Sequence, residues 1–139
     1  MKNYLVSVCL LLLAACRATE IAIPEPVKNI EGTWRITKAT RNGTDLTNVV
    51  DFSKFRLHFQ NNTYTIDNLL PFIVSGKGTW SLDDPQYPFK ITFHQEGVDS
   101  SVVTKFDYPI TDGQRIINLV FSPGCINNTY QYTLEKISK

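Results

Sequence analysis

The sequence predicts an all-β fold, an eight-stranded antiparallel up-and-down β-barrel, on three observations. From Asn29 onward, apolar and polar residues alternate with a period of two, which is typical of strands that bury one face. Eight such runs follow one another at short, regular intervals, as in barrels and sandwiches. Asn42-Gly43 and Asp112-Gly113 favour tight hairpins, which join neighbouring antiparallel strands. Because closure of the sheet removes its exposed edges, we expect a barrel closed upon itself.

Each predicted strand ends where turn-forming residues interrupt the alternation. The first four strands are residues 30–37, 55–60, 64–66 and 78–82, and the first, second and fourth lead to Asn-Gly, Asn-Asn and Asp-Asp-Pro sequences. The last four strands are residues 89–94, 102–110, 115–121 and 129–135, separated by turns that contain glycine. The one helical candidate is Thr47 to Phe52, where we expect one short helical turn after the first strand.

The N-terminus has the three parts of a secretory signal. Lys2 makes its start positive, residues 4–15 are almost wholly apolar, and small residues precede a cysteine. This apolar run is too short to cross a bilayer core of roughly 30 Å as a helix. Its end, Leu13-Ala14-Ala15-Cys16, resembles the lipobox of bacterial lipoproteins. The resemblance implies cleavage before Cys16 and attachment of lipid to its sulfur, with acyl chains that anchor the protein to a membrane.

The chain therefore divides into three predicted segments. Residues 1–15 are a signal peptide of the lipoprotein type, and residues 16–28 are the lipidated cysteine and an extended tether. The tether contains Ile23-Pro24-Glu25-Pro26-Val27, in which the prolines favour an extended path. Residues 29–139 form one barrel domain, which we expect to be a monomer.

Charge and cysteine content limit the partners. The full chain has 14 basic and 13 acidic residues, and the signal peptide carries a single charge, so the mature chain is formally neutral. A neutral chain without a basic run argues against nucleic acid as a partner. Cys9 leaves with the signal and Cys16 is capped by lipid, so Cys125 is left alone without a disulfide partner. We interpret Cys125 as an apolar filler at the edge of a turn, with a reactive thiol as the alternative.

Short motifs in the barrel carry a family resemblance. Gly32-Thr33-Trp34 is similar to the Gly-x-Trp signature of lipocalins, which open with this motif and continue as an eight-stranded meander. Gly78-Thr79-Trp80-Ser81-Leu82 and Tyr132-Thr133-Leu134-Glu135-Lys136 resemble a narrower group, the small lipocalin-like lipoproteins of Bacteroidetes. The resemblance covers residues 29–137 and implies a lipocalin-like barrel in the cell envelope. Phe106-Asp107-Tyr108 only approximates a further lipocalin motif, Thr-Asp-Tyr.

The alternation assigns aromatic residues to the inner face of the barrel, which leaves two interpretations open. An eight-stranded barrel either fills its interior with side chains or holds one small ligand. In the first case the aromatic rings form a filled core. In the second, some of them line a pocket for an apolar molecule at the barrel mouth. The candidate ligand-binding residues are Tyr64, Leu70, Phe72, Trp80, Tyr108, Tyr130 and Tyr132.

The segment 67–74 is unusually apolar for a connection between strands. It contains Leu69, Leu70 and Phe72. As a lid it would control entry to the barrel, and as an exposed patch it would dock a partner. Alternatively, Phe72 and Val74 share the parity of Trp80, so the strand starts early and passes through a bulge at Gly76 or Gly78.

The sequence contains no clear catalytic or metal-binding motif. His58 and His94 stand alone on predicted outward positions, without a second histidine at ligand spacing. We therefore expect no enzyme activity, no cofactor and no metal.

The predicted function is non-catalytic binding of a small apolar molecule by a lipid-anchored envelope protein. The alternative is a protein-interaction module, an inhibitor or accessory subunit of an envelope complex, with a filled barrel. Because Arg17-Ala18-Thr19-Glu20 does not resemble an acidic surface-export tag, we expect the periplasmic face of the outer membrane rather than the cell surface.

Overall fold

The computed structural model describes residues 23–68, 72, 74–125 and 127–137. The predicted signal peptide and Cys16 lie outside these residues, as does Leu70. Within the described ranges, no helix has the length and apolar character needed to cross a membrane.

The described residues form an all-β fold without a helix, in which every strand pairing is antiparallel. Its strands are β1 (Gly32–Arg41), β2 (Thr44–Asp45), β3 (Arg56–Gln60), β4 (Thr63–Asp67), β5 (Lys77–Leu82), β6 (Lys90–Gln95), β7 (Ser101–Asp107), β8 (Ile110–Thr111), β9 (Gln114–Phe121) and β10 (Tyr130–Lys136). The eight longer strands correspond to the eight runs that the sequence predicts. The short strands β2 and β8 only extend hairpins that start at β1 and β9.

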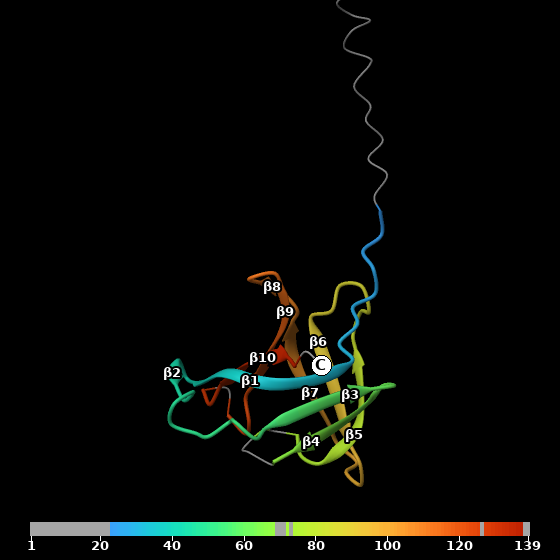
Figure 1. Cartoon of the computed structure of the whole chain (residues 1–139). Coiled ribbons are helices and arrows are strands. Elements are labelled where there is room, and N and C mark those ends of the chain that lie inside the picture. The colour runs from blue at the N-terminus through green and yellow to red at the C-terminus, as the bar shows by residue number, and fades with distance from the viewer. Residues whose placement is uncertain (1–22, 69–71, 73, 126, 138–139) are drawn as a thin grey trace, which may run out of the picture.

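The longer strands close into a barrel (Figure 1). Their order is β1-β3-β4-β5-β6-β7-β9-β10, and β10 then pairs with β1, so each strand has a neighbour on both sides. This is the predicted up-and-down path, because neighbours in the sheet are also neighbours along the chain.

Two hairpin turns follow the predicted chemistry. Asn42 and Gly43 have φ values of 49° and 81°, and Asp112 and Gly113 have values of 49° and 77°. Two successive residues with positive φ are what a type I′ hairpin requires, and Asn, Asp and Gly adopt this conformation at low cost.

The predicted helical turn at Thr47 to Phe52 is wrong. The Leu46 carbonyl accepts hydrogen bonds from the N–H groups of Val49 (2.9 Å) and Val50 (3.0 Å), and this single turn does not continue into a helix. The Asp51 carboxylate instead accepts the N–H of Ser53, which starts a new turn. A short run with β-branched valines and a competing aspartate does not overcome the cost of helix nucleation.

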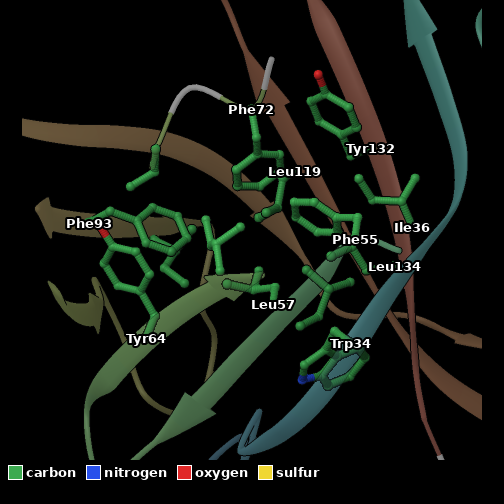
Figure 2. Packing of buried hydrophobic residues seen from close by; sticks show 14 of the residues in the cluster. Trp34, Ile36, Phe55, Leu57, Tyr64, Phe72, Phe93, Leu119, Tyr132 and Leu134 are labelled. Carbon is green, nitrogen blue, oxygen red and sulfur yellow. The ribbon is translucent and has the colours of Figure 1, made fainter. Parts of the chain in front are cut away.

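The core fills the barrel interior with the inward-facing side chains of the strands (Figure 2). Trp34, Phe55, Leu57 and Phe93 are each fully buried. Trp34 also donates its indole N–H to the Ile30 carbonyl at 2.8 Å, which satisfies the polar atom of a buried ring.

Several residues assigned to the inner face are less enclosed than the alternation predicts. Trp80, Leu82, Tyr108 and Tyr130 are only partly buried and pack against the edge of the core. Phe89 contradicts the prediction, because its side chain is 66% exposed. Phe89 precedes β6, and its N–H donates to the Asp83 carboxylate of loop 83–89, so the alternation of the strand does not set the direction of its side chain.

The barrel has two different ends. At the tether end, the chain enters β1 from residues 23–31 beside loop 83–89 and the β8–β9 hairpin (Figure 1). Lys28 there donates its backbone N–H to the Pro85 carbonyl at 2.7 Å. At the opposite, far end lie loop 46–55, the described residues 68, 72 and 74–76, connection 96–100, and residues 122–125 and 127–129.

Candidate functional site

An aromatic cluster closes the far end of the barrel. Phe72 lies at its centre, with ring centroids 5.2 Å from Phe55, 5.0 Å from Phe121 and 5.1 Å from Tyr132 (Figure 2). Phe55 immediately precedes β3, and the other two partners lie on β9 and β10, so Phe72 packs against side chains from three parts of the barrel. Tilted and edge-to-face ring pairs of this kind add to the energy of apolar burial. Phe72 therefore plugs the far end.

Tyr130 and Tyr132 extend this cluster toward the surface. Their rings are stacked at 6.3 Å with an interplanar angle of 8°, and the Arg41 guanidinium lies 5.4 Å from the Tyr130 ring centroid. Burial, together with the neighbouring Tyr130, raises the pKa of Tyr132 to about 12. The Tyr132 phenol is therefore neutral at physiological pH.

Tyr64 lies deeper in the barrel. Its side chain is 1% exposed and its ring meets Phe93 edge-on at 5.2 Å. Among the described residues, its hydroxyl has no hydrogen-bond partner, and burial raises its pKa to about 12. A buried hydroxyl without a partner is costly and rare.

Trp80 and Tyr108 lie toward the tether end, and backbone carbonyls already engage their polar atoms. The Trp80 indole N–H donates to Thr63 at 3.1 Å, and the Tyr108 hydroxyl donates to Asn29 at 2.9 Å. Burial raises the pKa of Tyr108 against the opposing effect of the nearby Arg115. Both residues therefore fasten the tether end of the barrel.

The predicted ligand-binding residues thus separate into groups. Phe72, Tyr130 and Tyr132 come together at the far end, Tyr64 lies in the interior, and Trp80 and Tyr108 lie near the tether end. The seventh candidate, Leu70, lies outside the described residues.

The apolar segment 67–74 contributes to the core at two positions. Phe72 and Val74 are both buried. The early start of the strand is wrong, because β5 begins at Lys77, after Gly76 with φ of 68°. The lid and docking interpretations depend on Leu69 and Leu70, which lie outside the residues that the structure describes.

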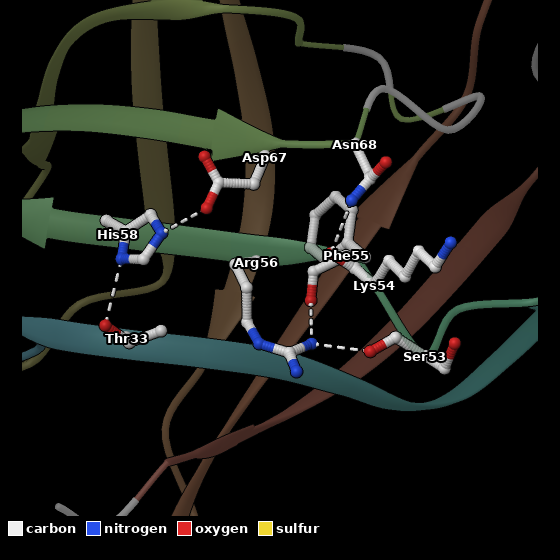
Figure 3. A network of polar contacts seen from close by, with 8 residues as sticks. All are labelled: Thr33, Ser53, Lys54, Phe55, Arg56, His58, Asp67 and Asn68. Atoms are coloured by element: carbon white, nitrogen blue, oxygen red, sulfur yellow. Dashed lines mark hydrogen bonds and ion pairs between the residues drawn. The ribbon is translucent and has the colours of Figure 1, made fainter.

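A hollow of about 680 Å³ lies on the outside of the far end, between β1 and loop 46–55. Its lining combines apolar and charged residues: Ile36, Val50 and Phe52 with Arg35, Asp51 and Arg56. The Arg56 guanidinium is fixed by hydrogen bonds from Nη1 to the carbonyls of Ser53 (2.8 Å) and Phe55 (2.6 Å) (Figure 3). Arg35 pairs with Glu135 across β1 and β10 at 3.2 Å. The sequence does not reveal this hollow, because it forms only where loop 46–55 lies beside β1.

His58 belongs to a polar chain across three strands on the outer face (Figure 3). Its Nδ1 lies 2.9 Å from the Thr33 hydroxyl of β1, and its Nε2 lies 3.0 Å from the Asp67 carboxylate of β4. The sequence shows His58 as an isolated residue, and only the strand register, in which Thr33 is opposite His58, identifies its partner. The side chains of His58 and Asp67 are partly exposed, so this chain connects the strands at the surface.

The remaining reactive side chains do not converge. Cys125 is a free, exposed cysteine, so its interpretation as a packed filler is wrong: loop 122–125 lies beyond the end of β9 and is exposed. His94 is exposed on the outer face of β6. In the part of the chain that the structure describes, no three His, Cys, Asp or Glu side chains are grouped to hold a metal ion.

The fold and its packing define a class, the small closed antiparallel β-barrel with a core of its own aromatic side chains. The chain belongs to the family described as Domain of unknown function (DUF5004), whose model matches residues 14–135. No curated protein and no solved structure matches the chain.

Proposed function

We propose that this protein is a lipid-anchored, non-catalytic binding protein of the bacterial cell envelope that contacts a partner protein through its outer surface. The filled barrel interior is the observation that carries this proposal. Side chains that would line a ligand pocket contact one another instead, as Phe59 does with Trp80 and Phe93 at 5.2 and 6.3 Å. A filled interior leaves the loops and the outer face as the binding surfaces.

The far-end hollow is the best candidate for the partner surface. Its arginines, held in place by neighbouring acceptors, lie beside apolar Val50 and the exposed Val49. Protein interfaces are enriched in arginine and in apolar anchors, and preorganised side chains lose less entropy when a partner binds. We therefore place an accessory or inhibitory contact at this end of a lipocalin-like barrel.

Photo-crosslinking in intact cells tests this proposal. A photoreactive residue at Asn48, in the lining of the hollow, is expected to yield a discrete protein adduct. Val49, which is 76% exposed in the same lining, is the second test position, and Lys105, exposed on β7, is the matched control. Adducts at Lys105 equal to those at both test positions would argue against a far-end partner site.

A second candidate function, binding of a small apolar molecule at the barrel mouth, rests on Tyr64. Its buried hydroxyl has no partner within the described residues, and a ligand with a hydrogen-bond acceptor would supply one if it entered beside Phe72. Native mass spectrometry of the protein mixed with envelope lipid extracts tests this candidate. Retention of one ligand by the wild type but not by Tyr64→Phe supports it, and no retained ligand contradicts it.

The lipid anchor and its location are tested separately. Metabolic labelling with palmitate is expected to label the wild type and to leave Cys16→Ser unlabelled. Protease treatment of whole cells is expected to spare the protein, since we propose the periplasmic face of the outer membrane. Digestion in intact cells would place it on the cell surface.

A further inference from the structure

Exposed apolar side chains gather at the tether end of the barrel. Val27, Tyr87, Phe89 and Ile110 are 65%, 53%, 66% and 60% exposed. They come from the tether, from loop 83–89 and from the β8–β9 hairpin, which lie at one end in Figure 1. Large apolar side chains grouped on one surface indicate an interaction site more strongly than scattered ones do.

The loop that carries Tyr87 and Phe89 is organised by two aspartates. One Asp83 carboxylate oxygen accepts the N–H groups of Phe89 and Lys90, each at 3.0 Å. The Asp84 carboxylate accepts the N–H of Tyr87, also at 3.0 Å. These bonds hold the loop backbone in place. The exposed positions of the two rings are therefore set by an ordered loop and do not result from fraying of β6.

Charges at the tether end do not form a basic patch. Lys28 pairs with Glu25, whose carboxylate also interacts with Arg115, and the backbone N–H of Lys90 donates to the Asp83 carboxylate. A surface of this composition would bind a lipid interface through its apolar and aromatic side chains, without needing anionic lipids.

We infer that the tether end docks on the lipid surface, with Tyr87, Phe89 and Ile110 inserted at the headgroup level. This inference rests on the proposed lipid anchor at Cys16. The chain between Cys16 and Val27 reaches at most about 40 Å when extended, at roughly 3.3–3.6 Å per residue, and it enters the barrel at this end. The anchor therefore enters the domain at the apolar end and keeps this end within reach of the membrane. Docking leaves the far-end hollow facing away from the bilayer.

Tryptophan quenching by brominated lipid tests the orientation. The mature lipidated protein is reconstituted in phosphatidylcholine vesicles whose acyl chains carry bromine, with Phe89→Trp or Ile110→Trp as the reporter. The matched controls are Val49→Trp at the far end and Val103→Trp on the side of β7, both at exposed valines. Residues buried about 5–10 Å into the interface should be quenched at least about twofold more than the controls, after subtraction of the wild-type signal from Trp34 and Trp80.

The possible results distinguish failure of the docking proposal from failure of the proposed lipid anchor. Mass spectrometry of the same preparation reports the acyl chains on Cys16, so protein without lipid overturns the anchor. Acylated protein that floats with the vesicles but shows equal quenching at all four positions overturns docking alone. A dimer in detergent-free solution that Phe89→Ser dissociates would also overturn it, because a second copy would then cover this end.

Discussion

The ring of Tyr64 on β4 packs against Gly78 on β5, its cross-strand partner. A Cβ atom added to Gly78 would lie 2.9 Å from Tyr64 Cε1 and 2.0 Å from the His94 carbonyl oxygen of β6. The glycine thus allows three strands to approach one another and allows an aromatic ring to cover the position.

Gly78→Ala should lower the free energy of unfolding by about 2 kcal/mol, because a backbone carbonyl paired in the β5–β6 ladder cannot move away easily. Urea denaturation measures the effect. The control is Thr79→Ala, at the exposed neighbouring position, which should change stability by less than about 0.5 kcal/mol. Equal stability of Gly78→Ala and the wild type would contradict the close approach.

Tyr64→Phe should raise the free energy of unfolding by about 1 kcal/mol, since it removes a buried hydroxyl that has no partner among the described residues. Tyr108→Phe is the matched control. It removes a hydroxyl that donates to Asn29 and should lower stability by about 1 kcal/mol. If Tyr64→Phe instead destabilises the purified protein, the hydroxyl binds a water molecule or a ligand.

Phe72→Ala should lower the free energy of unfolding by about 3 kcal/mol or more, because it removes the ring that contacts Phe55, Phe121 and Tyr132. Thermal unfolding measures the loss. Phe72→Leu, which keeps most of the volume, should cost less, and an equal cost for the two variants would show that cavity formation is not the cause.

Stability should decline in alkali between about pH 10 and pH 12. Burial raises the pKa values of Tyr64 and Tyr132 to about 12 in the folded state, above the unfolded value of about 10. The unfolded chain therefore loses these protons first, and the stability present below pH 10 is lost as the pH approaches the folded pKa. Denaturation across this range should show a shallower decline for Tyr64→Phe than for the wild type, and identical slopes would contradict the shift.

The sequence predicted correctly those features that depend on residues close together along the chain. Alternation located the eight long strands, and Asn42-Gly43 and Asp112-Gly113 located two hairpin turns, since both signals arise within a few residues. The same parity failed at Phe89, which lies just outside the strand that would have oriented it. The helical turn predicted at Thr47 to Phe52 is absent, because the single turn closed at Leu46 does not propagate and the Asp51 carboxylate accepts the N–H of Ser53 instead.

The candidate site depended on relations between distant strands, which local patterns do not contain. The sequence placed Tyr64, Trp80, Tyr108 and Tyr132 on one face, but inward orientation does not decide how far along the barrel each ring lies. That depth follows from the register of each pair and from the β1 irregularity between Ile36 and Lys38.

By itself, the sequence determined the strand order, the Asn-Gly and Asp-Gly hairpin turns and the aromatic character of the interior. Each of these depends on residue type and on the period-two alternation along the chain. The tertiary structure decided that Phe72 closes the far end, that the Tyr64 hydroxyl is left without a partner in the described residues, and that Tyr87 and Phe89 are exposed together at the tether end. These outcomes depend on closure of β10 onto β1, which brings residues a hundred positions apart, such as Arg35 and Glu135, into contact and fixes the volume that the rings fill.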